Sequence, residues 1–521
     1  VVRTTNGPVR GLTGDGVQIF KGIRYGAPPT GSLRFMPPQR PTPWIDVIDA
    51  RDFGNPAIQS PIPFTGGSGT ETEAAKAQKA ILSMYFAGDT RPVSEDCLFL
   101  NVWTPATDSG KRPVMVWLHG GAFESGSGAA NLSEGSHLAR QGDIVLVTAN
   151  HRLNALGYLY LGDLMGPRYA KSGTVGMLDL VLMLQWVRDN IGAFGGDPTN
   201  VTIFGESGGG SKVSTLMGMP AAQGLFHKAI MQSAGPKAPW EASTEIARRT
   251  LADLKIQPGD RDSLQTIPAM RLLEVANAAA SRPPRAGIPS SPARFAPVID
   301  GEVIQSDYWA HDAPVESRSI PMLIGFNKDE ATLNNAGQEW FGQLTDEQMK
   351  ARAAAMLGPH SDAMIAAYRA EHPDDSPTYI LTGLLSAQWM FDWAYRIADT
   401  KVTQGGAPVW MYYLAWTAPI GNGVLKSPHT LDVPLMFDNT ALAAAFVGDG
   451  VGARKLARQM STAWAAFART GNPNTADLPK WPAFDSRGRA AMRFDNTPRV
   501  VSDPDGAVVR ALRAGNTVAA S

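Results

Sequence analysis

The chain has a single cysteine, Cys97, among its 521 residues. No disulfide can therefore form within one chain, and sulfur does not staple this protein. A lone cysteine can also be a nucleophile, but Cys97 opens the apolar, strand-like run CLFLNVW. We expect it to be a small buried hydrophobic residue rather than a reactive thiol.

The sequence also lacks a charge excess and any long apolar run. Lys and Arg number 47 against 48 Asp and Glu, a formal net charge of −1, so nothing favours binding to nucleic acid or to an anionic membrane surface. No run reaches the ~18 apolar residues of a transmembrane helix. A hydrophobic content of 44% with 18% charged residues is typical of a globular protein.

The first residue is Val1 rather than Met, and this leaves the location open. If a signal peptide was removed before Val1, the protein is periplasmic or secreted; otherwise it is cytoplasmic.

What the sequence does have is an alternation of strands and helices between residues 97 and 233. Apolar runs predict strands at 98–103, 114–121, 144–152, 201–207 and 228–233, and a helix at 177–191. Continuous apolar strands separated by helices indicate a mostly parallel sheet that is buried on both faces.

The remaining segments predict an α/β protein with additions to this sheet. Residues 1–50 alternate short β-type runs with Gly and Pro turns, which predicts an antiparallel meander. Residues 60–94 predict a long surface loop with one short helix. Strands at 321–326 and 409–416 and a helix at 453–470 complete the pattern.

We expect one catalytic domain over residues 1–521, because the candidate chemistry is spread along the whole chain. Helical insertions at about 241–320 and 331–400 are expected to form a lid or regulatory subdomain.

The most informative segment is FGGDPTNVTIFGESGGG, residues 194–210. It places Ser207 in a G-x-S-x-G pattern between a β-branched strand and a small-residue helix start. Such a strand–turn–helix elbow holds a serine hydroxyl above a sheet, beside a backbone N–H. This arrangement suits acyl transfer.

A serine nucleophile needs a base, and the base needs an orienting acid. In sheets of this type the chain order is Ser, acid, His, and His429 has the right context because it follows the strand 409–416 and a Gly-rich loop. Asp329 and Glu330 lie together on the loop after the strand 321–326. Their spacing alone does not say which of the two is the acid.

The oxyanion hole needs backbone N–H groups near the developing negative oxygen. The strand at 114–118 runs into His119-Gly120-Gly121-Ala122, which matches an HGGG-type donor loop. We expect His119 itself to be structural.

Several motifs together resemble the type-B carboxylesterase family, which includes bacterial p-nitrobenzyl esterases and animal cholinesterases. FGGDPTNVTIFGESGG fits the family's serine signature, and SEDCLFLNVWTP (94–105) is similar to its second signature. GIRYGAPPTGSLRFMPPQRPTPW (22–44), GFNKDEA and SPHTLDVPLMFDN resemble its N-terminal hallmark, acid loop and histidine loop. The resemblance covers nearly the whole chain.

The resemblance implies an α/β-hydrolase fold and assigns roles to nine residues. The family's acid is the second carboxylate of its pair, here Glu330, which completes a triad with Ser207 and His429. Its other positions fall on the oxyanion donors Gly121, Ala122 and Gly208 and on the polar neighbours Glu206, Ser233 and Asp432. It implies no metal and no cofactor, a small-molecule ester and water as reactants, and a monomer or weak homodimer.

The sequence departs from the family pattern at three places. Where the family has a third glycine in its triplet, this chain has Ala122. Where the family has an alanine after the nucleophile, this chain has Gly208. The cysteine that would pair with Cys97, near Ala57, is missing. In cholinesterases the corresponding loop carries a tryptophan whose ring binds the choline cation. The segment 57–97 of this chain has no tryptophan, which argues against a choline ester as the preferred substrate.

We therefore expect a serine carboxylesterase that works through an acyl-enzyme. Hydrolysis of an amide, lactam or carbamate by the same triad is the alternative activity, and a scaffold protein without catalysis is the alternative class. Because His429 must be neutral to act as a base, activity should rise through about pH 6 to 7.5.

Overall fold

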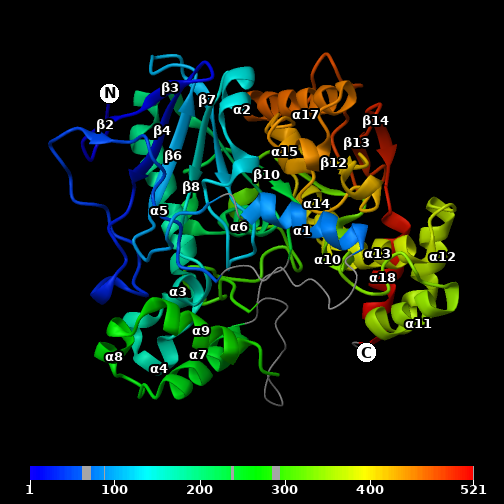
Figure 1. Cartoon of the computed structure of the whole chain (residues 1–521), viewed down its shortest axis with the longest axis horizontal. Helices are drawn as coiled ribbons and strands as arrows, with labels where there is room; N and C mark the ends of the chain where they lie inside the picture. The colour runs from blue at the N-terminus through cyan, green and yellow to red at the C-terminus, as the bar shows by residue number, and fades with distance from the viewer. Residues whose placement is uncertain (61–71, 87–88, 236–239, 284–293, 520–521) are drawn as a thin grey trace.

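An eleven-stranded sheet runs through the structure in the order β14-β13-β12-β11-β10-β9-β7-β8-β6-β4-β3 (Figure 1). The computed structural model describes residues 1–60, 72–86, 89–235, 240–283 and 294–519. The strands of this sheet are β3 (Leu12–Gly14), β4 (Val17–Arg24), β6 (Phe99–Thr104), β7 (Arg112–Leu118), β8 (Val145–Ala149), β9 (Gly196–Glu206), β10 (Lys228–Gln232), β11 (Met322–Asn327), β12 (Val409–Leu414), β13 (Ala490–Phe494) and β14 (Arg499–Ser502).

The sheet is parallel in its middle and antiparallel at its two edges. Neighbouring strands run parallel from β8 through β13 in the spatial order given above, whereas β14 at one edge and β6, β4 and β3 at the other run antiparallel to their neighbours. Because the middle strands point the same way, their carboxyl ends meet at one edge of the sheet, where ligand sites of α/β proteins form.

Helices cover both faces of the sheet. They are α1 (Glu73–Phe86), α2 (Ser136–Gly142), α3 (Asn154–Tyr158), α4 (Gly162–Met165), α5 (Val175–Asn190), α6 (Gly208–Leu216), α7 (Trp240–Leu254), α8 (Arg261–Thr266), α9 (Ala269–Ala280), α10 (Glu330–Asn335), α11 (Asp346–Leu357), α12 (Ser361–Glu371), α13 (Pro377–Ser386), α14 (Asp392–Gln404), α15 (Asp432–Met436), α16 (Ala444–Val447), α17 (Val451–Thr470) and α18 (Gly506–Ala519).

Strand β7 shows why the middle strands are apolar along their whole length. Val114 and Val116 belong to the core cluster that contains residues of α5. Met115 and Trp117 point to the other face and belong to the cluster that contains residues of α17. Alternate side chains thus enter two different cores, so neither face tolerates polar residues.

The α/β fold class is confirmed, and the N-terminal segment differs in detail from the expectation. Residues 1–50 do not form one meander, because β1 (Val2–Arg3), β2 (Pro8–Arg10) and β5 (Ile48–Asp49) make a separate three-stranded sheet in which β2 and β5 are parallel. These strands of two or three residues are too short to show a pattern in the sequence.

Helices lie within both of the predicted insertions, and residues 284–293 of the first insertion lie outside the described residues. Helices α7, α8 and α9 lie together at the lower left of Figure 1, and α11, α12 and α13 lie at the lower right beside α18. Their role as a lid remains a prediction.

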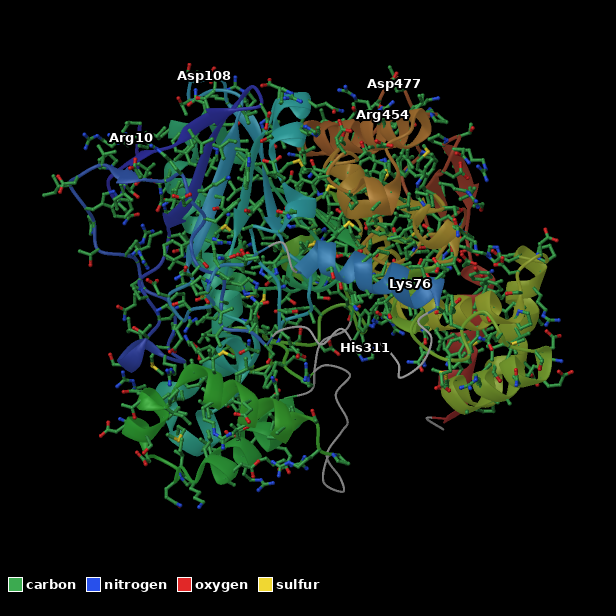
Figure 2. All side chains as sticks on the ribbon, in the orientation of Figure 1. Arg10, Lys76, Asp108, His311, Arg454 and Asp477 are labelled. Atoms are coloured by element: carbon green, nitrogen blue, oxygen red, sulfur yellow. The ribbon has the colours of Figure 1, made fainter. Side chains whose placement is uncertain are left out.

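Cys97 is buried, with 1% of its surface exposed, and burial raises the pKa of its thiol. Charges of both signs mix on the surface, since Arg10, Asp108, Arg454 and Asp477 all lie along the upper outline of Figure 2. Among the described helices none combines the length and the apolarity that a membrane crossing requires.

Candidate active site

Ser207 lies in the sharp turn between β9 and α6. Its backbone has φ 57° and ψ −122°, a conformation that an L-residue adopts only under strain. The turn needs the glycines around it, because a Cβ on Gly209 would lie 2.0 Å from the carbonyl oxygen of Leu118. The Ser207 N–H donates to the carbonyl of Gln232 at 2.8 Å, which ties the turn to β10.

His429 and Glu330 meet beside this turn. Glu330 is the first residue of α10, just after β11, and His429 lies in the loop before α15. His429 Nδ1 is 2.5 Å from Glu330 Oε2. The other carboxylate oxygen, Oε1, accepts the Ser233 hydroxyl at 2.5 Å and the Asn327 N–H at 2.7 Å. Glu330 is therefore held by three donors.

Asp329, the other acid that the spacing allowed, faces elsewhere. Its Oδ2 accepts the N–H of Ser427 at 3.1 Å, and its Oδ1 lies 3.1 Å from Lys328 Nζ. It fixes the loop that carries His429, while Glu330 contacts the imidazole.

Glu206 faces the opposite side of the same ring. Its Oε1 lies 3.2 Å from His429 Nε2, and its Oε2 accepts the Tyr85 hydroxyl at 3.0 Å. Burial raises the pKa of Glu206 to about 8. Burial alone would lower the pKa of His429, but Glu206 and Glu330 together outweigh it and raise this pKa to about 9.

The Ser207 hydroxyl has no hydrogen-bond partner among the described residues, and the side chain is partly exposed. A short contact with His429 Nε2 is thus not formed in this structure. Catalytic hydrogen bonds are often long without substrate. Trp389 packs against the imidazole with 4.7 Å between ring centroids, which limits the ring's movement.

Asp432 does not contact His429 through a recorded hydrogen bond. Its Oδ2 accepts Gln232 Nε2 and the Tyr412 hydroxyl, both at 2.7 Å. The Gln232 carbonyl in turn accepts the Ser207 N–H. Asp432 therefore supports the serine turn through Gln232 and does not hold the imidazole.

The predicted oxyanion donors lie around the turn. Neither Gly121 nor Ala122 uses its N–H in a hydrogen bond to another described residue, and Gly208 opens α6, where a helix leaves its first N–H groups free. A Cβ on Gly208 would lie 2.2 Å from the carbonyl oxygen of Ala122. A glycine at 208 therefore leaves room for the backbone of residue 122.

Sequence reasoning missed four groups of this site: Tyr85, Gln232, Tyr412 and Lys212. The contact between Tyr85 and Glu206 joins residues 121 positions apart, and no local pattern signals such a contact. Lys212 did leave a signal in the sequence, because it is a charged residue among the small residues of GGGSKVS, directly after the serine turn. A lysine that is buried at such a position is normally hydrogen-bonded.

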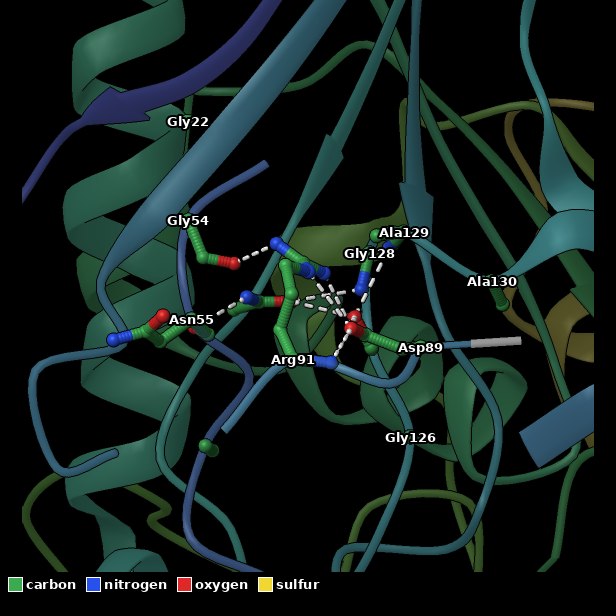
Figure 3. Close-up of polar contacts among 12 residues, drawn as sticks. Gly22, Gly54, Asn55, Asp89, Arg91, Gly126, Gly128, Ala129 and Ala130 are labelled. Atoms are coloured by element: carbon green, nitrogen blue, oxygen red, sulfur yellow. Dashed lines mark hydrogen bonds and ion pairs between the residues drawn. The ribbon is translucent and has the colours of Figure 1, made fainter. Parts of the chain in front are cut away.

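Polar contacts, rather than a disulfide, hold the segment that follows Tyr85, at Asp89 and Arg91 (Figure 3). Arg91 donates to the Gly54 carbonyl and pairs with Asp89, and Asp89 Oδ2 accepts the Ser127 hydroxyl at 2.7 Å. A cavity of about 260 Å³ lies beside this network, with Tyr85 in its wall.

Glu371, His372 and Asp505 form a cluster of possible metal ligands away from this site. His372 Nε2 lies 2.6 Å from Asp505 Oδ1, and Asp505 Oδ2 accepts the Tyr413 hydroxyl at 2.7 Å. These contacts, with the Asp505 N–H donating to Glu371 Oε2 at 2.9 Å, explain the cluster as a hydrogen-bonded network. The exposed His311 lies apart from it, near the lower centre of Figure 2.

Comparison with known proteins identifies the family of this chain. The profile of the carboxylesterase family matches residues 1–511. A para-nitrobenzyl esterase of Bacillus subtilis is 35% identical over 515 residues, which cover 97% of this chain and 96% of the relative. A phenmedipham hydrolase of Pseudarthrobacter oxydans is 32% identical over 527 residues, covering 98% and 99%.

Solved structures give the same result. The carboxylesterase EST55 of Geobacillus stearothermophilus superposes with a TM-score of 0.81 at 35% identity, covering 98% of this chain and 99% of that one. A family profile over nearly the whole length, relatives that are 32–35% identical and a shared fold together identify the family. The chain belongs to the carboxylesterase family and is a carboxylic ester hydrolase of the α/β-hydrolase fold.

Proposed function

We propose that Ser207, His429 and Glu330 hydrolyse carboxylic esters through an acyl-enzyme. The observation that carries this proposal is the 2.5 Å contact between His429 Nδ1 and Glu330 Oε2, close to a serine held in a strained turn. The contact makes Nδ1 the protonated nitrogen and leaves Nε2 to accept a proton.

In the first half of the reaction, Ser207 Oγ attacks the ester carbonyl while His429 Nε2 takes its proton. The carbonyl oxygen becomes an anion that the N–H groups of Gly121, Ala122 and Gly208 stabilise. The carbon–oxygen bond to the alcohol then breaks, and His429 protonates the leaving alkoxide. Glu330 stabilises the imidazolium that exists between these two steps.

In the second half, water attacks the acyl-enzyme and His429 takes its proton. The oxyanion forms again, the bond to Ser207 Oγ breaks, and His429 returns a proton to the serine. The products are an acid and an alcohol, and no cofactor is consumed. The family's small-molecule esters set the substrate class; the acid and alcohol groups have to be mapped with an ester panel.

Replacing the nucleophile tests the proposal. Ser207→Ala should lower kcat by at least ~10⁴-fold on a p-nitrophenyl ester. Ser214→Ala is the matched control, because Ser214 is a buried serine of the same helix whose hydroxyl donates to the Ser211 carbonyl at 2.9 Å; its kcat should stay within ~3-fold.

Labelling with a fluorophosphonate gives a second readout. Intact-protein mass should show one adduct, and peptide mapping should find it on Ser207. Normal turnover by Ser207→Ala, or an adduct on another residue, would contradict the assignment. Parallel assays with a matched anilide separate ester from amide hydrolysis.

A further inference from the structure

Helix α6 carries a buried lysine behind the proposed oxyanion hole. Lys212 has 0% of its surface exposed. Its Nζ donates to two backbone carbonyls of the loop after β7, that of His119 at 2.9 Å and that of Ala122 at 2.8 Å. Burying an amino group is costly unless it is bonded, so this position demands an explanation.

We propose that Lys212 is a positioning residue for the oxyanion hole. It holds loop 119–123 so that the N–H groups of Gly121 and Ala122 point toward the substrate carbonyl. The inference rests on the proposed function of this loop and names the side chain that fixes its geometry.

The argument follows from the peptide plane. In a trans peptide the carbonyl of one residue and the N–H of the next point in opposite directions. A carbonyl that is hydrogen-bonded to another group of the protein therefore leaves the N–H of the next residue pointing away from that group. The carbonyls that share a peptide with the Gly121 and Ala122 N–H groups are those of Gly120 and Gly121. Lys212 fixes the carbonyls on either side of this pair, those of His119 and Ala122, and so fixes where the pair lies.

The two carbonyls between these anchors are held as well. The Gly120 carbonyl lies 2.9 Å from His119 Nδ1, and the Gly121 carbonyl accepts the N–H of Ser125 at 3.1 Å. All four carbonyls from His119 to Ala122 thus have a hydrogen-bond partner within the protein. Within the described part of the chain, the N–H groups of Gly121 and Ala122 donate to no other residue.

The histidine beside Lys212 adds no second positive charge to this buried region. His119 stacks on His151 with 5.0 Å between ring centroids. Burial, followed by the nearby Lys212, lowers the pKa of His119 to about 3. A neutral His119 ring can carry its proton on Nδ1 and donate it to the Gly120 carbonyl.

Burial also lowers the pKa of Lys212 to about 7. The amine keeps at least two N–H groups in either protonation state. Two is the number of carbonyls that it bonds, so the anchor persists when the proton is lost.

Another buried lysine provides the control. Lys401 has 0% of its surface exposed and donates to the Arg318 carbonyl and to Gln404 Oε1, both at 3.1 Å. Arg318 precedes β11, so this lysine lies at the amino end of the strand, whereas Glu330 follows its carboxyl end. Removing Lys401 should cost folding stability without touching the oxyanion loop.

The experiment compares Lys212→Met, Lys212→Gln and Lys401→Met on a p-nitrophenyl ester. Lys212→Met keeps the side-chain volume and removes the donors; we expect kcat to fall ~10–100-fold with KM within ~3-fold. Lys212→Gln keeps an N–H donor at shorter reach, and its kcat should fall ~3–10-fold. Lys401→Met should keep kcat within ~2-fold, although its Tm falls.

An aryl trifluoromethyl ketone, which forms an oxyanion adduct with serine, adds a readout that a packing role would not move. Its Ki should rise in Lys212→Met by the factor that kcat/KM falls, while the Ki of the matching methyl ketone stays constant. Unchanged kcat in a folded Lys212→Met, or an equal loss in Lys401→Met, would overturn the inference. If Lys212→Met does not fold, Lys212→Gln decides: lower kcat at constant KM supports the inference and full kcat overturns it.

Ser207→Ala, assayed in parallel, separates the two proposals. Activity in Ser207→Ala would refute the nucleophile assignment. An inactive Ser207→Ala beside a fully active Lys212→Met would refute the positioning role alone.

Discussion

Two buried glutamates face opposite nitrogens of the same imidazole. Glu330 lies 2.5 Å from His429 Nδ1 and also accepts the Ser233 hydroxyl and the Asn327 N–H. Glu206 lies 3.2 Å from Nε2 and accepts one recorded hydrogen bond, from Tyr85. Its Oε1 accepts none within the described residues.

The difference shows that surroundings, not residue type, assign the two roles. Several donors around a carboxylate favour its ionised form, whereas burial without donors favours the neutral acid. Burial accordingly raises the pKa of Glu206 to about 8. Glu330 thus has three donors around its carboxylate, whereas Glu206 accepts a hydrogen bond from one tyrosine hydroxyl.

The largest effect should come from Glu330→Gln. A glutamine amide can donate to His429 Nδ1, which leaves the proton on Nε2, so the ring can no longer accept the serine proton. We expect kcat to fall ~10³–10⁴-fold, measured on a p-nitrophenyl ester with the folded fraction checked by circular dichroism.

Asp329→Asn is the matched control for this change, since it neutralises the neighbouring buried acid. Its amide oxygen can still accept the Ser427 N–H, so the loss should stay below ~10-fold. Equal losses in the two variants would remove the distinction between the adjacent acids.

Asp329 and Glu330 also show how much of the site could be predicted from the sequence. The strand before them and the histidine after them were predictable, because the middle strands are buried on both faces and read as continuous apolar runs. Spacing could not choose between Asp329 and Glu330, since adjacent residues share every local signal. The choice depends on a half-turn of backbone at the start of α10, and only the resemblance to the carboxylesterases supplied it.

The Glu206 side was harder to predict. Tyr85 comes from a segment that the sequence presents as a loop with a short helix, and α1 in fact has 14 residues. Its contact with Glu206 is a tertiary contact with no local pattern. The small N-terminal sheet was predicted wrongly for a related reason. Its strands β1, β2 and β5 have two or three residues each, so pairing rather than periodicity defines them.

Glu206→Gln should move the pH profile. His429 acts as a base only when neutral, and its pKa is raised to about 9, chiefly by Glu206 and Glu330 against the effect of burial. Activity should therefore rise toward pH 9, above the range of 6 to 7.5 that an ordinary histidine gives. Removing Glu206 should lower the midpoint of kcat/KM against pH by about one unit or more.

Glu371→Gln is the control for that shift, because Glu371 is a carboxylate far from the imidazole, near His372 and Asp505. Its profile should match that of the unmodified enzyme. A midpoint that Glu206→Gln leaves unchanged would mean that Glu206 does not stabilise the imidazolium.

Ser233→Ala tests the donors on the Glu330 side. It removes the hydroxyl that donates to Oε1 at 2.5 Å and leaves the Asn327 N–H in place. With two of its three donors kept, Glu330 should still orient the ring, and kcat should fall by only ~3–10-fold. A loss as large as that of Glu330→Gln would show that the serine, rather than the set of donors, defines the acid.

Tyr85→Phe should give the smallest effect, on the Glu206 side. The hydroxyl at 3.0 Å stabilises ionised Glu206, so its loss should keep Glu206 neutral to higher pH and weaken its pull on the imidazolium. The midpoint should move down, as in Glu206→Gln, but by less than about half a unit. Tyr395→Phe, which removes a buried hydroxyl bonded to the Pro504 carbonyl, should leave the midpoint in place. In the double variant Tyr85→Phe/Glu206→Gln the tyrosine should add nothing, because its effect passes through the carboxylate; additive shifts would place Tyr85 in direct control of His429.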